Sequence, residues 1–331
     1  NSHFIVKYDE TLLADLAQAA TNLSAISQLQ LLQDQRLLSE GRLTSYASVV
    51  PLLQNFANSE HVIVTIALYD VANNLKKFVT PDSDAERELQ VFFDNLSRNQ
   101  VDRLGWHAQS GDSIEDVITR PLVLRAALYA QNAEAIAAAH DLFVAQQADL
   151  AALPAEVRGL VLRNEVENFG DESLFNQLLQ AYVASSDATF KRDIQGALTQ
   201  TPDPALIATL INKFEDANTI KPQDLRAWYL GVLANKHGQQ AAWDWIRSDW
   251  QWLSDTVGGD MEFTTYIMVT AGIFKTAERL AEFKAFFEPK LPTPGLTREI
   301  TMDIKVVETR VALIEAEQEA VNAAVRQVNN K

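Results

Sequence analysis

The sequence contains no cysteine, which excludes disulfides, zinc–thiolate sites and thiol catalysis. Basic residues are also scarce: 28 Lys and Arg stand against 44 Asp and Glu, so the formal net charge is −16. Phosphate binding needs a concentration of Lys and Arg, which this sequence lacks. We therefore expect no nucleic-acid partner and no anionic membrane partner.

Long apolar runs are missing as well. The longest, Val62–Ala72, is interrupted by Thr65 and Asp70, whereas a membrane span needs about 18–20 apolar residues. The start shows no basic segment followed by an apolar one, so we predict no signal peptide. Together with the absence of cysteine, this favours a cytoplasmic protein. Because the chain starts at Asn1 rather than Met, we also expect it to be a piece of a longer protein.

Common motifs for catalysis, metal binding and phosphate binding are absent too. None of the five histidines begins an H-E-x-x-H zinc motif, and there is no phosphate-binding glycine loop and no G-x-S-x-G elbow. We predict no catalytic residue, no metal ligand and no cofactor in this chain. A site assembled from distant histidines and carboxylates stays open as an alternative.

Hydrophobic residues recur at helical spacing from about Glu10 onward. Leu206, Leu210 and Phe214 fall on one helical face, behind Asp203 at the N-cap position and Pro204 at the first helical position. Such segments predict roughly fifteen helices of about 10–20 residues. The last one is a single long helix from Gly295 to about Val328.

Proline positions suggest where these helices break. The breaks are placed at Pro81, Pro121, Pro154, Pro202, Pro222, Pro289, Pro292 and Pro294. The connecting loops are short, and short loops make consecutive helices antiparallel neighbours. Many such pairs in a row predict an all-α fold, an α-solenoid of the HEAT or armadillo type, over residues 10–331.

The first residues differ from the rest. Phe4, Val6 and Tyr8 alternate in the manner of a β-strand. One strand is not stable alone. We therefore predict that residues 1–9 are the terminal strand of a sheet that lies upstream.

Four tryptophans lie within ten residues, at 243, 245, 250 and 252. Trp243 and Trp250 share a helical face with Ile246 and Leu253, so core packing is favoured over a ligand-stacking patch.

Several segments, in order, resemble the aminopeptidase N family of zinc metallopeptidases. His3-Phe4-Ile5-Val6-Lys7-Tyr8-Asp9 is similar to the family's G-Y-Y-R-V-x-Y-D, and Ile220-Lys221-Pro222-Gln223-Asp224 to its I-[RK]-x-Q-D. Ala242-Trp243-Asp244-Trp245, followed by Asp249-Trp250, resembles A-W-D-F-x-x-x-N-W, and the final segment is most similar to lactic-acid-bacterial members.

This resemblance implies the non-catalytic, helical C-terminal domain of an enzyme that removes N-terminal residues from peptides. It implies a zinc ion in the parent enzyme, held by residues that this chain does not contain. The implied partners are the upstream catalytic and β-sandwich domains and the peptide substrates. The domain would cap the active-site cavity and control substrate access.

Arg226, Lys236 and Arg298 flank helix starts or loops, where a cation can bind a peptide's terminal carboxylate. They are our candidate substrate contacts, against the simpler interpretation of solvated surface charges. Two further interpretations stay open: a free-standing HEAT-like scaffold that binds another protein, and a separate enzyme with a carboxylate site.

Overall fold

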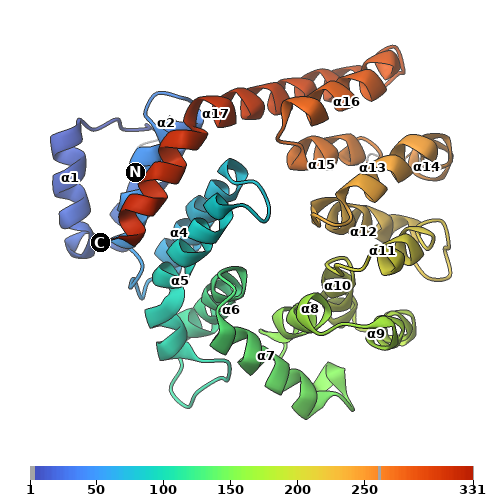
Figure 1. The fold of residues 1–331 in the computed structure, drawn as a ribbon, viewed down its shortest axis with the longest axis horizontal. Coiled ribbons are helices and arrows are strands. Elements are labelled where there is room, and N and C mark those ends of the chain that lie inside the picture. The colour runs from blue at the N-terminus through green and yellow to red at the C-terminus, as the bar shows by residue number, and fades with distance from the viewer. Residues whose placement is uncertain (1–3, 260–261, 331) are drawn as a thin grey trace. The chain divides into compact units, whose positions relative to one another are not determined.

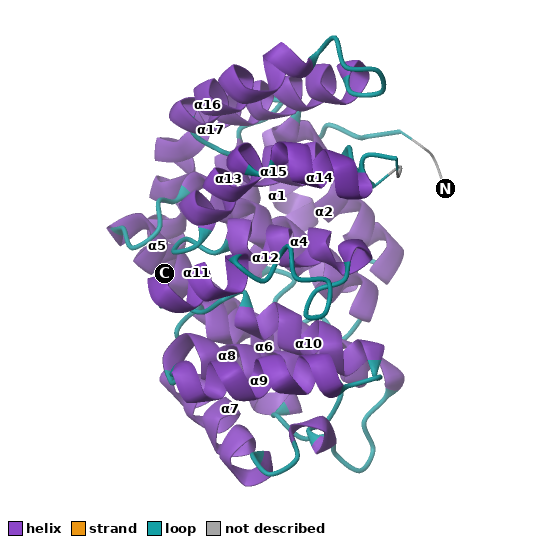
Figure 2. Cartoon of the chain, turned by 90° about the vertical axis from the view of Figure 1, so that its right-hand side faces the viewer, coloured by secondary structure: helices purple, strands orange, loops and turns teal. Residues whose placement is uncertain are grey.

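The computed structural model describes residues 4–259 and 262–330. Within these ranges the protein is entirely helical, with seventeen α-helices, five short 3-10 turns and no strand (Figure 2). The α-helices are α1 (Glu10–Gln18), α2 (Ala25–Glu40), α3 (Val49–Gln54), α4 (Val62–Asn74), α5 (Asp84–Leu104), α6 (Ile114–Tyr129), α7 (Ala133–Gln146), α8 (Arg158–Asn168), α9 (Glu172–Ala184), α10 (Ala188–Leu198), α11 (Pro204–Ile211), α12 (Pro222–Ala234), α13 (Gln239–Ser248), α14 (Trp250–Val257), α15 (Thr265–Ile273), α16 (Ala277–Phe287) and α17 (Thr297–Asn329).

Side-chain caps fix many of the helix starts. The Asp203 carboxylate accepts the Ala205 N–H at 2.8 Å, and Pro204 follows at the first helical position, as the sequence predicts. Ser113 and Asp116 form a reciprocal capping box at the start of α6. The predicted long last helix is also confirmed, as α17.

Two details differ from the sequence prediction. Pro121 lies inside α6 rather than at a break. A proline inside a helix costs about 3 kcal/mol, and here Val123, Leu124 and Ala127, buried just beyond it, hold the helix together.

The strand expected at the start is not formed either. Residues 4–9 have no regular secondary structure, and residues 1–3 lie outside the described ranges. The Val6 N–H donates to the Asp34 carboxylate of α2 at 3.2 Å rather than to a neighbouring strand. An extended segment without such a neighbour cannot complete a β ladder.

The helices form two compact units. Unit 1 comprises residues 1–141 and 313–331, and unit 2 comprises residues 142–312. Unit 1 combines helices from both ends of the chain, and Figure 1 shows the red second half of α17 beside the blue α2. The Glu317 carboxylate accepts hydrogen bonds from the Ser45 hydroxyl at 2.7 Å and the Tyr46 N–H at 3.0 Å. Asn322 and Asn329 donate to the carbonyls of Phe78 and Glu88.

Aromatic packing dominates the core of unit 2. Trp243 is fully buried, and its ring lies 5.0 Å from Phe274 and 5.6 Å from Phe286 in edge-on geometry. Trp250 packs on Phe263 at 4.9 Å. Such pairs stabilise beyond their buried area. The predicted core role is confirmed for Trp243, whereas Trp250 packs on these rings but is only half-buried.

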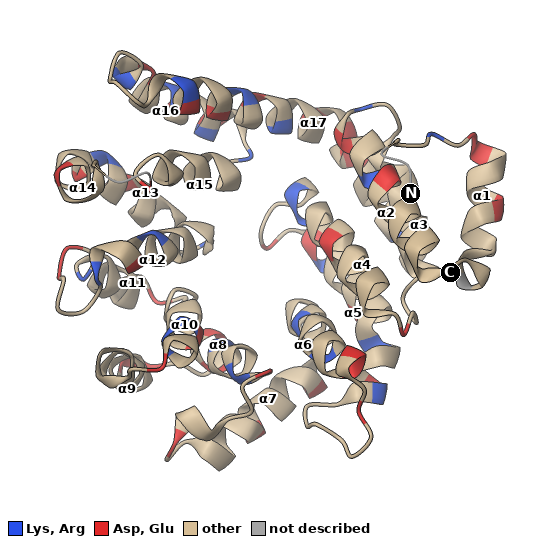
Figure 3. Ribbon diagram, turned by 180° about the vertical axis from the view of Figure 1, so that it is seen from behind, with Lys and Arg blue, Asp and Glu red and all other residues tan. Residues whose placement is uncertain are grey.

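Charged residues of both signs occur on most helices (Figure 3), but one ion pair of unit 2 is buried. The Arg158 guanidinium of α8 donates to the Asp193 carboxylate of α10 at 2.7 Å, and their side chains are 5% and 16% exposed. Burial raises the pKa of Asp193, and the hydrogen bond from Arg158 opposes that shift. The pair therefore links α8 to α10. Removing either partner would leave the other as an uncompensated buried charge.

We expect Asp193→Ala to lower the free energy of unfolding by about 3–5 kcal/mol, because it leaves the buried Arg158 charge uncompensated. Chemical denaturation measures this. Glu167→Ala is the control: its partner Arg163 has a side chain that is 47% exposed, so the loss should stay below about 1 kcal/mol. Equal losses for the two variants would contradict the structural role of the buried pair.

Asp303 of α17 is only 5% exposed, and its Oδ2 has no hydrogen-bond partner. Burial and the neighbouring Glu299 raise the pKa of Asp303 to about 7, and Arg310 opposes the shift. Between about pH 4 and pH 7 the folded chain therefore binds more protons at this position than the unfolded chain does. Its contribution to stability falls as the pH rises through this window.

We expect Asp303→Asn to remove this slope, since an amide does not titrate. Unfolding measured from pH 4.5 to pH 7.5 should show the wild type losing stability relative to the variant up to about pH 7. A stability difference that does not change with pH would contradict the raised pKa.

Candidate functional site

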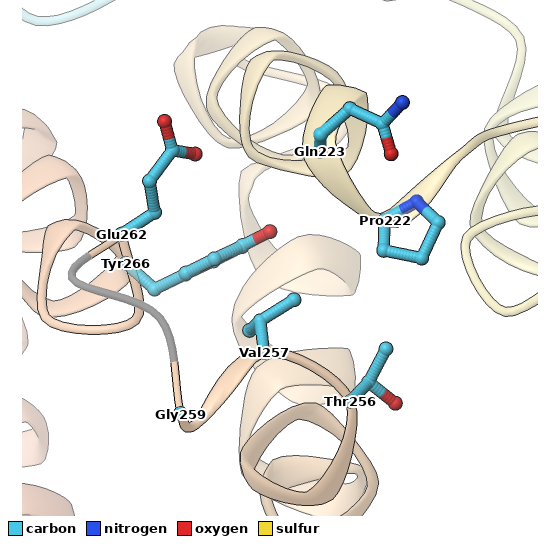
Figure 4. Close-up of a pocket in the computed structure, with 7 residues that line it drawn as sticks. All are labelled: Pro222, Gln223, Thr256, Val257, Gly259, Glu262 and Tyr266. Atoms are coloured by element: carbon cyan, nitrogen blue, oxygen red, sulfur yellow. The ribbon is translucent and has the colours of Figure 1, made fainter.

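A cavity of about 580 Å³ lies in unit 2, where the start of α12 meets the end of α14 and the start of α15 (Figure 4). Its volume falls within the roughly 300–1,000 Å³ typical of small-molecule sites. It is lined by Pro222 and Gln223 of α12, Thr256 and Val257 of α14, Tyr266 of α15, and Gly259 and Glu262 from the intervening loop.

Tyr266 is the side chain that sets the chemistry of this cavity. The residue is 1% exposed, and Figure 4 shows its hydroxyl pointing toward the first turn of α12. Burial raises the pKa of this phenol, Glu262 raises it further, and Arg226 opposes them. The hydroxyl therefore stays protonated at neutral pH.

The first turn of α12 presents a second donor. Pro222 has no N–H, and Lys221 at the N-cap makes no side-chain capping bond. The Asp224 and Leu225 N–H groups bond back to the Lys221 carbonyl at 2.9 and 3.2 Å. The N–H of Gln223 thus remains at a helix end that carries partial positive charge.

Of the three cations predicted to contact a substrate, only Arg226 approaches this cavity. It is half-buried on α12, close enough to Tyr266 to influence its pKa. Lys236 is exposed beyond the end of the same helix. Arg298 is exposed in the first turn of α17. The structure does not gather the three into one site, and their contact with a substrate stays a prediction.

Unit 1 holds another cavity, of about 630 Å³, beside α5 and the start of α7. Its most prominent charge, Asp94, is already engaged: its carboxylate accepts from Asn132 at 2.7 Å and pairs with Arg98. The contact with Asn132 joins α5 to the start of α7, so the Asp94 carboxylate has a structural role here.

The histidines do not converge on a site. His61, His107 and His237 are exposed, His140 is half-buried, and His3 lies outside the described residues. Over residues 4–259 and 262–330, no group of three His, Cys, Asp or Glu side chains is placed to hold a metal ion. No helix in these ranges is long and apolar enough to cross a bilayer.

Sequence reasoning missed the Tyr266 cavity. Tyr266 belongs to no motif, and nothing in its neighbours along the chain shows that its side chain lines a cavity. The loop that leads to it, Gly259 to Phe263, has a superficial likeness to the G-x-M-E-N loop of the aminopeptidase N family, which we attribute to coincidence because the last position differs.

Comparison with known proteins gives the family. Residues 1–309 match the model of the ERAP1-like C-terminal domain. Aminopeptidase N of Lactobacillus helveticus is 54% identical over 325 residues, which cover 98% of this chain and 38% of that protein. Aminopeptidase N of Lactobacillus delbrueckii subsp. lactis is 50% identical, with 98% and 39% covered. Aminopeptidase M1 of Arabidopsis thaliana is 26% identical over 94% of this chain and 36% of its own length.

The chain thus spans less than two fifths of the length of these curated relatives. The resemblance inferred from the sequence motifs is confirmed over nearly the whole chain. This chain belongs to the ERAP1-like C-terminal domain family.

Proposed function

We propose that this chain is the non-catalytic C-terminal domain of a zinc aminopeptidase that removes N-terminal residues from peptides. The observation that carries the proposal is the family match over residues 1–309, together with aminopeptidases N as relatives. In this proposal the helices form a HEAT-like solenoid that caps the active-site cavity and controls which peptides enter. In the longer protein, residues 1–9 then pair as the terminal strand of a preceding β-sandwich domain, although residues 4–9 form no strand in this chain.

The zinc ion of this proposal belongs to the upstream part of the longer protein. The described residues of this chain do not fit a zinc site, because no three potential ligands converge among them. The chain's own part in the reaction is therefore to shape the space around the substrate. Arg226, Lys236 and Arg298 are the side chains we propose for contacts with a peptide.

An exposed apolar patch in unit 1 supports docking to other domains of the longer chain. We call this set the α4/α6 patch, and its members are Ile63 and Ile66 of α4 and Ile114, Val117 and Ile118 of α6, all 38–78% exposed. The two helix starts adjoin, because the Glu115 carboxylate accepts the Val62 N–H at 3.0 Å. Contiguous exposed aliphatic side chains are typical of a surface that another domain covers.

The alternative is a free-standing HEAT-like scaffold that binds a separate protein, and the α4/α6 patch suits such a partner as well. The gene that encodes this chain discriminates between the two. A zinc-binding H-E-x-x-H helix encoded upstream supports the aminopeptidase domain, whereas an open reading frame that starts near Asn1 supports the scaffold.

Zinc content and aminoacyl-anilide hydrolysis of the purified chain test the non-catalytic role. We expect no stoichiometric zinc and no turnover, because no metal-ligand or catalytic motif is present in the sequence. Bound zinc with steady turnover would overturn the proposal, and the five histidines would then be the first positions to mutate.

We expect the isolated chain to self-associate through the α4/α6 patch, and the double variant Ile66→Gln, Ile118→Gln to weaken this. Light scattering over a range of concentrations measures the association. Val91→Gln is the matched control, because Val91 is 48% exposed on α5 outside the patch. A strictly monomeric wild type at high concentration, or equal effects of the patch and control variants, would count against the interface.

A further inference from the structure

Two hydrogen bonds attach the segment before α1 to unit 1. The Val6 N–H donates to the Asp34 carboxylate of α2 at 3.2 Å. The Lys7 ammonium donates to the Leu43 carbonyl, just beyond the end of α2, at 3.0 Å. Two successive residues without regular secondary structure are thus held against the same part of unit 1.

The next two residues continue this attachment. Tyr8 packs against the buried core of unit 1. The Asp9 carboxylate accepts the Leu12 N–H at 2.8 Å and caps the start of α1. A flexible linker makes few such contacts and keeps its conformational freedom, whereas residues 6–9 make one contact each.

Asp34 is the most buried of the groups that hold the segment. The residue is 5% exposed, and over residues 4–259 and 262–330 its carboxylate accepts one hydrogen bond, from the Val6 N–H. No cationic side chain in these ranges forms an ion pair with it. Burying a carboxylate is costly unless it is paired, so the backbone N–H that Asp34 accepts best explains its presence at this position.

The remaining backbone of the segment is open to a further partner. The N–H groups of Ile5 and Lys7 donate to no residue that the structure describes, and the side chains of Phe4 and Ile5 are 77% and 52% exposed. Unpaired backbone groups beside exposed apolar side chains are typical of an edge that another strand covers. In the proposed longer protein, that strand belongs to the preceding β-sandwich domain.

We propose that Asp34 fixes the direction in which the preceding domain joins unit 1. Asp34 is a positioning residue, because it acts through Val6, while the N–H groups of Ile5 and Lys7 pair with the preceding domain. The junction is then a fixed joint, and the preceding domain follows unit 1 instead of swinging on a linker. The inference rests on the proposed function, since its partner is the preceding domain of the longer protein.

Amide hydrogen exchange of the purified 331-residue chain, followed by NMR, tests the anchor. We expect the Val6 amide to be protected. Asp34→Ala should make it exchange about tenfold faster or more, because a hydrogen bond to a charged group is lost. Asp34→Asn keeps an acceptor oxygen and should retain more of the protection. Helix content by circular dichroism should stay unchanged in both variants, since the Asp34 carboxylate bonds no other described residue.

Asp15→Ala is the matched control for this measurement. Asp15 is exposed on α1, and its carboxylate bonds no described residue, so exchange at Val6 should stay within about twofold of the wild type. A Val6 amide that exchanges as fast as in an unstructured peptide would overturn the anchor. Equal acceleration by Asp34→Ala and Asp15→Ala, or by Asp34→Ala and Asp34→Asn, would overturn it as well.

The fixed joint is tested in the full-length protein, by the spread of distances between a nitroxide at Val91 of unit 1 and one on the preceding domain. We expect a narrow distribution that broadens in Asp34→Ala and not in Asp15→Ala. Equal widths in the wild type and Asp34→Ala would overturn the joint. The exchange measurement involves no zinc and no peptidase assay, so its failure leaves the proposed aminopeptidase role standing. A gene without an upstream domain would overturn that role, whatever the exchange at Val6.

Discussion

Unit 1 depends on the second half of α17, which closes its core. Leu313, Ile314, Val321, Val325 and Val328 are buried in one cluster with apolar side chains of α2 to α6. Each α-helix buries only one face, so without this last helix the cluster would be open to water. The polar contacts of Glu317, Asn322 and Asn329 then set the register, because each satisfies a backbone or side-chain group of a particular early segment. The first and last parts of the chain must therefore fold together.

Unit 2 is stabilised in a different way. Its helices α11 to α16 are mostly short, and short helices are marginal on their own. Large aromatic side chains compensate: Trp245 packs on Phe214 at 5.0 Å and on Tyr229 at 5.7 Å, while Trp243 contacts three phenylalanines. A few rigid rings thus bury enough surface to join helices whose own contact faces are small. The Tyr266 cavity lies at the margin of this aromatic packing, where α12, α14 and α15 meet.

Most buried polar side chains are paired, as Arg158 is with Asp193 and Asn235 with the carbonyls of Thr199 and Thr201. Tyr266 lines a cavity where α12, α14 and α15 meet.

Local patterns in the sequence determined much of this protein. Helical periodicity predicted the all-helical architecture, and Asp203-Pro204 predicted the start of α11. These features depend on a few neighbouring residues and on backbone geometry, so they can be read along the chain. The ordered motifs likewise identified the family, because they reflect shared ancestry rather than packing.

Only the tertiary structure decided which segments meet. It placed Pro121 inside a helix, left residues 4–9 without a strand partner, and divided the helices into two units with α17 shared between them. It brought Arg226 near Tyr266, forty residues away along the chain, and left Lys236 and Arg298 exposed elsewhere. The physical reason is that burial, pKa shifts and unpaired donors are properties of a side chain's surroundings. Those surroundings come from helices far apart in the sequence.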